Sequence, residues 1–361
     1  MTPRERLHAC LDFSGPDRVL YFSMRAPIPT MDRWRREGYP GDADFAEYFG
    51  LDAMLTGKWI LSMSLGPLPN DGDTIIDETE EYIIQKNTLG AVTQLQKGHQ
   101  DYGGAHYLSF PVVDQDTFDR VKHFYNPTDP ARYSKDWPQR VAEWSDRDYP
   151  LIFSIPGPFA FIRGLMGMEG LCIATYEQPA LIEDMVEFLT DFVTKAIGKA
   201  LSEVEVDVLL FGAEDMAYKN ATILSPDSVR HYMFGSYKKI TEFCLQNGAR
   251  QIMLDSDGHV DELIPIWLDA GISSVLPFEA AAGMDPVRIR RKYPKLGMLG
   301  GIDKRVLSRG KAEIESEVMT KVPPLLDSGG FIPSIDHILS PDIPLEGFRY
   351  YTELIRKISE K

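Results

Sequence analysis

The sequence predicts a single-domain (β/α)₈ TIM barrel over residues 1–361, with a small antiparallel β insertion near residues 72–113. Short apolar runs alternate with amphipathic helical runs, a pattern typical of a parallel sheet. Eight such apolar runs occur, and an α/β barrel of this length forms one domain. No G-x-G-x-x-G or P-loop motif follows any of them, which disfavours the competing fold, an open nucleotide-binding sheet.

The first half of the chain contains the less regular elements. Residues 18–23 (RVLYFS) and 52–56 (DAMLT) predict the first two strands of the barrel. Residues 72–113 alternate polar and apolar side chains around a Leu-Gly turn, which predicts antiparallel strands. Residues 125–149 are rich in Asp, Pro and Arg, and they predict an excursion that leads into a helix.

From residue 151 onward, predicted strands and helices alternate regularly. The six further strands are expected at residues 151–155, 206–211, 251–254, 274–278, 296–299 and 331–334. Apolar side chains at 3.6-residue spacing predict a long helix over residues 179–203. Ser225-Pro226 is typical of a helix start, and Gly248 is expected to end that helix. The last two helices are expected over residues 311–327 and 344–358.

Charge and composition narrow the classes of function. The net charge of −16 disfavours nucleic acid and anionic membranes as partners, because both require a positive face. The three cysteines form no Cys-x-x-Cys pair, which favours reduced thiols. No apolar stretch predicts a signal peptide or a membrane span. We therefore expect a cytoplasmic protein that binds a small molecule.

Acidic and histidine side chains follow the late predicted strands. The active site of a (β/α)₈ barrel lies at the carboxyl ends of its strands. Five consecutive strands deliver such residues there: Glu214 and Asp215, Asp255 and Asp257, Glu279, Asp303, and Asp336 with His337. Buried acids need a partner, a proton or a metal. Their convergence therefore predicts a functional site.

Each of these residues also has a structural interpretation. Asp215 could simply accept hydrogen bonds from loop amides, and Asp255-Ser256-Asp257-Gly258 could be a capped turn. His337 could be a satisfied core histidine. We nevertheless expect catalytic roles for Asp257, His337, Glu279 and Asp215. We expect substrate binding by Arg25, Arg163, Asp255 and Met166.

Several motifs, in this order, resemble the uroporphyrinogen decarboxylase superfamily. They are PGPFAFIRGLMG, VDVLLFGAEDMA, LDSDGHVDELIPIWLDAGI, VLPFEAAAGMDP, LGMLGGIDKRVL and GGFIPSIDHILSPDIPLEGFRYY. The resemblance covers most of the chain and implies a (β/α)₈ barrel. It implies one of two activities: cofactor-free decarboxylation of uroporphyrinogen, or zinc-dependent methyl transfer involving a corrinoid protein.

Two departures from the decarboxylase pattern disfavour the first activity. The decarboxylases carry R-Q-A-G-R after the first strand, whereas residues 24–28 here read MRAPI and keep only Arg25. Their substrate-binding Asp after the second strand has no counterpart in residues 55–59, LTGKW. A substrate with eight carboxylates needs several cations. His337, however, matches the late histidine of the family.

The second activity requires a different zinc site from that of the coenzyme M methyltransferases. Their H-x-C motif after the fifth strand corresponds to Asp255 and Asp257, so zinc thiolates are absent. Oxygen and nitrogen ligands remain available from Glu214, Asp257, Glu279 and His337. Zinc accepts such ligands, as in the O-demethylase branch that the sequence resembles. The full ligand spacing does not match, so the presence of a metal stays open.

The leading hypothesis is a methyltransferase of the O-demethylase type, linked to a corrinoid-carrying partner protein and assisted by zinc. It would demethylate a small substrate such as an aryl methyl ether. The alternatives are a uroporphyrinogen decarboxylase-type lyase and a non-catalytic ligand-binding barrel. The sequence leaves open the identity of the methyl donor and the oligomeric state, a homodimer included.

Overall fold

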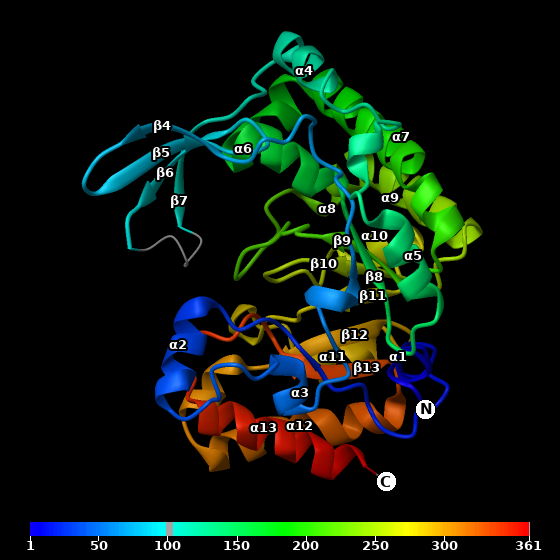
Figure 1. Ribbon diagram of the computed structural model, residues 1–361. Helices are drawn as coiled ribbons and strands as arrows, with labels where there is room; N and C mark the ends of the chain where they lie inside the picture. Colours follow the sequence, from blue (N-terminus) through cyan, green and yellow to red (C-terminus); the bar gives the residue numbers. More distant parts are fainter. Residues whose placement is uncertain (99–103, 361) are drawn as a thin grey trace.

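The computed structural model describes residues 1–98 and 104–360, and it has a mixed α/β fold built on parallel strands (Figure 1). Strands β1 (Phe22–Ser23) and β2 (Ala53–Met54) form a parallel pair. Seven further parallel strands form one sheet in the order β13-β12-β11-β10-β9-β8-β3. Their bounds are β3 Ile60–Leu61, β8 Ile152–Pro156, β9 Val208–Gly212, β10 Gln251–Asp255, β11 Ser274–Leu276, β12 Gly297–Ile302 and β13 Phe331–Ile335.

The predicted α/β class and the antiparallel insertion are confirmed, because every predicted strand overlaps an observed one. Within the described residues, β2 does not pair with β3. The parallel strands therefore form two separate sheets, β1-β2 and the seven-stranded sheet that ends at β3. Strand β3, which pairs with β8, was not predicted. It contains only two residues, and so short a run carries no periodicity that a sequence pattern can reveal.

Thirteen α-helices accompany the strands in the described part of the chain. They are α1 Pro3–Leu11, α2 Ile28–Arg36, α3 Phe45–Phe49, α4 Gln115–Lys122, α5 Trp137–Ser145, α6 Pro158–Glu177, α7 Pro179–Glu203, α8 Pro226–Tyr232, α9 Phe234–Gln246, α10 Ile264–Asp269, α11 Pro286–Lys292, α12 Lys311–Ser328 and α13 Leu345–Ser359. The helix predicted from Pro226 is broken at the fully buried Met233, which separates α8 from α9. None of the described helices is long and apolar enough to cross a membrane.

The insertion is an antiparallel sheet that projects from the body of the molecule (Figure 1). Its strands are β4 Thr74–Glu78, β5 Tyr82–Lys86, β6 Val92–Gln96 and β7 Ala105–Ser109, paired in chain order. Residues 99–103 of the predicted insertion lie outside the described residues. The β5–β6 turn is closed by the Asn87 side chain, which accepts hydrogen bonds from the Leu89 and Ala91 amides.

Alternate side chains of the parallel strands enter two separate hydrophobic clusters. Phe153, Leu209 and Leu254 belong to the larger cluster, which contains the apolar faces of most helices. Ile152, Leu210 and Met253 belong to a second cluster with residues of α1 and β1. Because successive side chains of a strand point to opposite faces, the sheet is buried on both sides. Because β8 to β13 pair in parallel, their carboxyl ends lie at the same edge of the sheet.

Candidate active site

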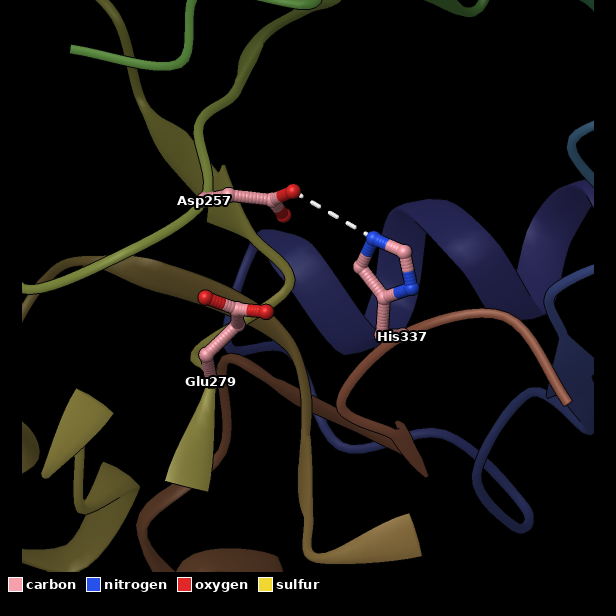
Figure 2. Close-up of side chains that lie close together, drawn as sticks. All are labelled: Asp257, Glu279 and His337. Atoms are coloured by element: carbon pink, nitrogen blue, oxygen red, sulfur yellow. Dashed lines mark ion pairs between the residues drawn. The ribbon is translucent and has the colours of Figure 1, made fainter. Parts of the chain in front are cut away.

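Asp257, Glu279 and His337 form a cluster in the loops that follow β10, β11 and β13. One ligand atom from each lies within 4.8 Å of the others, and all three residues are half-buried. Figure 2 shows the three side chains pointing toward one another. His337 Nε2 lies 3.3 Å from Asp257 Oδ2. The structure thus brings together three residues for which the sequence predicts catalytic and metal-binding roles.

The loops that carry this cluster are tied together by hydrogen bonds to carboxylates. The Gly258 amide donates to Glu279 Oε2 at 2.9 Å, which links the loops after β10 and β11. Asp336 is buried and accepts from the Ala280 amide at 2.8 Å and from the Lys304 amide at 3.0 Å. Asp336 therefore joins the loops after β11, β12 and β13, so a role in positioning accounts for it.

The His337 ring lies between the carboxylate of Asp257 and the ammonium group of Lys304. Its Nε2 faces Asp257, and its Nδ1 lies 3.5 Å from Lys304 Nζ. The hydrogen bond that His337 donates to Asp257 raises the pKa of His337, although burial and the Lys304 charge oppose this. A histidine with a raised pKa holds its proton more readily near neutral pH, so His337 can serve as an acid.

The acids around the cluster repel one another. Burial raises the pKa of Asp255 to about 7, and the charges of Asp215 and Asp257 add to the shift. Burial and the Asp257 charge also raise the pKa of Glu279. Raised carboxyl pKa values indicate that the site holds buried acids with too little positive charge nearby. Perturbed pKa values are common at functional sites.

The donor set of the cluster fits a divalent cation such as zinc. Two carboxylates and one imidazole are ligands that zinc accepts, and a catalytic zinc site keeps a further position open. A cation would also relieve the repulsion among the acids. One feature opposes it: a metal-bound histidine ordinarily donates its other ring N–H to an acceptor. At Nδ1, His337 instead faces the Lys304 ammonium group, which can only donate.

A pocket of about 610 Å³ lies beside the cluster, bordered by Asp255 and Ile338. Its wall is mostly apolar and includes Phe161 of α6 and Leu89 of the β5–β6 turn. Among the described residues that line it, Arg25 is the only cation and Asp255 the only acid. The pocket therefore suits a small, largely apolar molecule with at most a few charged groups.

The other predicted substrate-binding residues occupy different places. Arg25 is exposed in the pocket wall, and its guanidinium has no hydrogen-bond partner within residues 1–98 and 104–360. Arg163 Nη1 pairs with Asp215 Oδ2 at 3.0 Å, and its Nη2 donates to the Ala213 carbonyl at 2.9 Å. Met166 is buried in the core and does not line the pocket.

Glu214, a predicted metal ligand, is not part of the cluster. It is fully buried, and its oxygens accept from the Phe159 amide at 3.2 Å and the Ala160 amide at 2.7 Å. The Tyr237 hydroxyl also donates to it. Burial raises the pKa of Glu214 to about 7, against the effect of these three hydrogen bonds. Asp303 likewise turns away, because it caps the turn at residues 304–308 and pairs with Arg305.

Sequence reasoning missed Lys304 and Tyr237, which contact His337 and Glu214 respectively. Lys304 follows directly after Asp303 at the carboxyl end of β12, so its place after a strand was a usable signal. Tyr237 lies inside α9, where one aromatic residue on an apolar face looks like ordinary core. Its role depends on a contact across 23 residues of sequence that no local pattern reveals.

Comparisons with known proteins identify relatives of this chain. The sequence profile described as "Uroporphyrinogen decarboxylase (URO-D)" matches residues 100–358. A solved structure titled "methyltransferase from Methanosarcina mazei" has a TM-score of 0.62 at 17% identity, with 99% of each chain covered. This likeness shows a shared fold.

Two further solved structures are more distant. A B12-independent methionine synthase from Shewanella sp. W3-18-1 has a TM-score of 0.40 at 10% identity, covering 86% of this chain and 84% of that one. A putative vitamin-B12 independent methionine synthase from Listeria monocytogenes has a TM-score of 0.41 at 14% identity, covering 96% and 99%. No curated protein matches the chain in sequence.

Proposed function

We propose that this chain, which belongs to the uroporphyrinogen decarboxylase family, is a methyltransferase. A methyltransferase with the same fold supports this choice within the family. It removes a methyl group from a small substrate such as an aryl methyl ether and passes it to the Co(I) corrinoid of a partner protein. The observation that carries this proposal is the cluster of Asp257, Glu279 and His337 beside a mostly apolar pocket.

The charge of the pocket favours this reaction over uroporphyrinogen decarboxylation. A substrate with eight carboxylates needs many cations, but Arg25 is the only cation among the described lining residues. Arg25 suits a single anionic group, because its free guanidinium offers five N–H donors. We assign to Arg25 the binding of such a group and to the apolar wall the binding of the substrate body.

The chemistry requires activation of the leaving oxygen. The bond between the methyl carbon and the ether oxygen breaks, and its electron pair stays on the oxygen. The electron pair of Co(I) forms the new bond to the methyl carbon, so cobalt is oxidised by two electrons. The oxygen is a poor leaving group unless it receives a proton or a Lewis acid.

The cluster can supply this activation in either form. Protonated His337, held by Asp257 at 3.3 Å, can donate its Nε2 proton to the oxygen, so that the ring becomes neutral and the alcohol leaves uncharged. A zinc ion held by Asp257, Glu279 and His337 would polarise the same oxygen. Asp255 borders the pocket, and burial raises its pKa to about 7, so its charge changes with pH near neutrality.

The proposal is tested with the purified protein, cob(I)alamin and a methoxybenzoate. We expect methylcobalamin and the phenol to form in equal amounts, with zinc found by elemental analysis if the metal route operates. Asp257→Asn and His337→Ala should each abolish the transfer, whereas Glu169→Gln, an exposed acid on α6, should leave it unchanged. Decarboxylation of uroporphyrinogen by the metal-free protein would contradict the proposal. So would an absence of methylcobalamin with methoxyarenes and methylamines alike.

A further inference from the structure

Directly after β9, Ala213 has an unusual backbone conformation. Ala213 has φ 57°, the left-handed region, which a residue with a side chain rarely adopts. Such strain persists only where surrounding contacts fix it, and it is concentrated at functional sites. The next two side chains, Glu214 and Asp215, have different partners.

Glu214 caps helix α6 from outside the helix. Pro158 begins α6 and has no N–H, and the next two amides, of Phe159 and Ala160, both donate to the Glu214 carboxylate. A carboxylate at this end of a helix satisfies free N–H groups and favours the helix dipole. The fit is tight, because a Cβ at Gly157 would lie 2.4 Å from Glu214 Cδ. Ala160 and Phe161, which line the pocket, belong to this capped turn.

Asp215 connects the same helix to the loop of the cluster. Its Oδ2 accepts from Arg163, on the second turn of α6, at 3.0 Å, and its Oδ1 accepts from the Asp257 amide at 3.3 Å. The backbone reinforces this link, because the Glu214 amide donates to the Asp255 carbonyl at 2.8 Å. One short segment thus contacts both the pocket wall and the loop that carries Asp257.

We propose that the adjacent pair Glu214–Asp215 is a positioning element that fixes the pocket wall formed by α6 to the loop that carries Asp257. Neither residue touches the substrate. Glu214 sets the place of Ala160 and Phe161, and Asp215 sets the place of the Asp257 backbone. Substrate held against α6 is thereby kept at a constant distance from the cluster. The catalytic part of this inference rests on the proposed function; the structural part does not.

The structural part is tested by amide hydrogen exchange in peptides that cover residues 157–165. Glu214→Gln keeps the shape of the side chain but replaces one acceptor oxygen with an NH₂ group, so one α6 amide loses its partner. We expect exchange in this region to become about tenfold faster, the size of effect that a lost helix cap produces. Tyr237→Phe should cause a smaller increase in the same peptides. Glu169→Gln is the matched control, because Glu169 lies on the same helix and its side chain has no hydrogen-bond partner among the described residues.

The catalytic part is tested by comparing KM and kcat across these variants. Glu214→Gln should raise KM for the methylated substrate by about tenfold with a smaller effect on kcat, because the pocket wall is displaced and the acid is not. Asp215→Asn should lower kcat as well, since the Asp257 amide loses an anionic acceptor. Glu214→Asp, which keeps the charge, should recover part of the KM.

Each result bears on one proposal only. Unchanged exchange over residues 157–165 in Glu214→Gln would overturn the positioning role, even in a protein that transfers methyl groups. An inactive wild type would contradict the proposed function and leave the exchange measurement decisive. If Glu214→Gln does not fold, Gly157→Ala provides the second variant, because its Cβ displaces the Glu214 carboxylate without removing it. Faster exchange confined to residues 157–165 in that variant would support the role, and unchanged exchange would overturn it.

Discussion

The ammonium group of Lys304 lies 3.5 Å from Nδ1 of His337, on the ring edge opposite Asp257. Because an ammonium group can only donate, Nδ1 must accept, and the proton of the neutral ring lies on Nε2. That proton points at Asp257. The contact between Lys304 and His337 therefore favours the tautomer with its proton on Nε2, facing Asp257, whereas metal binding at Nε2 would require the opposite tautomer.

Replacement of Lys304 should favour a metal. In Lys304→Gln, an amide oxygen can accept from Nδ1–H, and a positive charge next to the cation site is lost. We expect zinc affinity to rise by about tenfold or more, in line with the effect of other partners of metal ligands. Zinc titration against a competing chelator measures it. Lys135→Gln, exposed and remote from the pocket lining, is the control, and a lower affinity in Lys304→Gln would refute this reading of the site.

Replacement of Asp257 should lower the pKa of His337. The hydrogen bond donated to Asp257 is the largest cause of the raised pKa of His337, so Asp257→Asn should return this pKa toward its ordinary value. NMR titration of the ring signals gives the pKa directly. The folded pKa is raised, so the stability from this pair is complete below the unfolded pKa of about 6.5 and is lost as pH rises through the folded pKa. Asp257→Asn should therefore be more destabilising at pH 5 than at pH 9.

Asp255 should make stability depend on pH in the region of neutrality. Its pKa is raised to about 7 by burial and by Asp215 and Asp257, so the folded state binds a proton that the unfolded state releases. Wild-type stability should therefore rise as pH falls from 8 to about 5, because protonation removes a buried charge. Asp255→Asn has no such charge, and its melting temperature should exceed that of the wild type at pH 8. Equal differences between the two proteins at pH 5 and pH 8 would show that Asp255 does not titrate in this range.

Replacement of Arg25 should separate substrates by charge. Arg25→Gln removes the only cation among the described lining residues, so KM for a substrate with a carboxylate should rise by about 10- to 100-fold. An uncharged methoxyarene of the same size should be turned over as well as by the wild type. Steady-state kinetics with such a matched pair of substrates measures this. An equal rise in KM for both substrates would mean that Arg25 maintains the shape of the pocket and does not bind the carboxylate.

Gly167 should be irreplaceable within α6. It has φ 74° inside the helix, and a Cβ there would lie 2.3 Å from Phe110 Cε2. Gly167→Ala should cost on the order of 3 kcal/mol from backbone strain and overlap, measured by urea unfolding. Gly198→Ala in α7 is the matched control, since its Cβ meets only Phe243 at 3.7 Å. That change should stabilise the protein by up to about 1 kcal/mol. Similar losses in both variants would exclude the proposed cause.

The sequence was sufficient to predict the cluster because strand ends are strongly marked. Asp257, Glu279 and His337 each follow an apolar run that forms a strand of the parallel sheet. The carboxyl ends of parallel strands lie at the same edge of the sheet. The separation of Glu214 from this cluster could not be predicted. It depends on the left-handed backbone of Ala213, and alanine, unlike glycine, gives no sign of such a conformation.

Contacts between segments that are distant in the sequence could not be predicted either. Arg163 looked like a cation free to bind substrate, but it pairs with Asp215, 52 residues away. Met166 lies in the same helix as Phe161, and both side chains are buried in the core, yet only Phe161 lines the pocket. Rotation of a helix about its axis decides which apolar residue faces a ligand, and that rotation is set by tertiary packing.

The antiparallel sheet contributes Leu89 to the pocket while its strands stand apart from the parallel core (Figure 1). Residues in such an appendage can change without disturbing the packing that holds Asp257, Glu279 and His337 in place. One part of the ligand contact, at Leu89, is therefore encoded apart from the reaction chemistry. Exchange of this sheet would therefore change the pocket at Leu89 and leave Arg25 and the cluster in place.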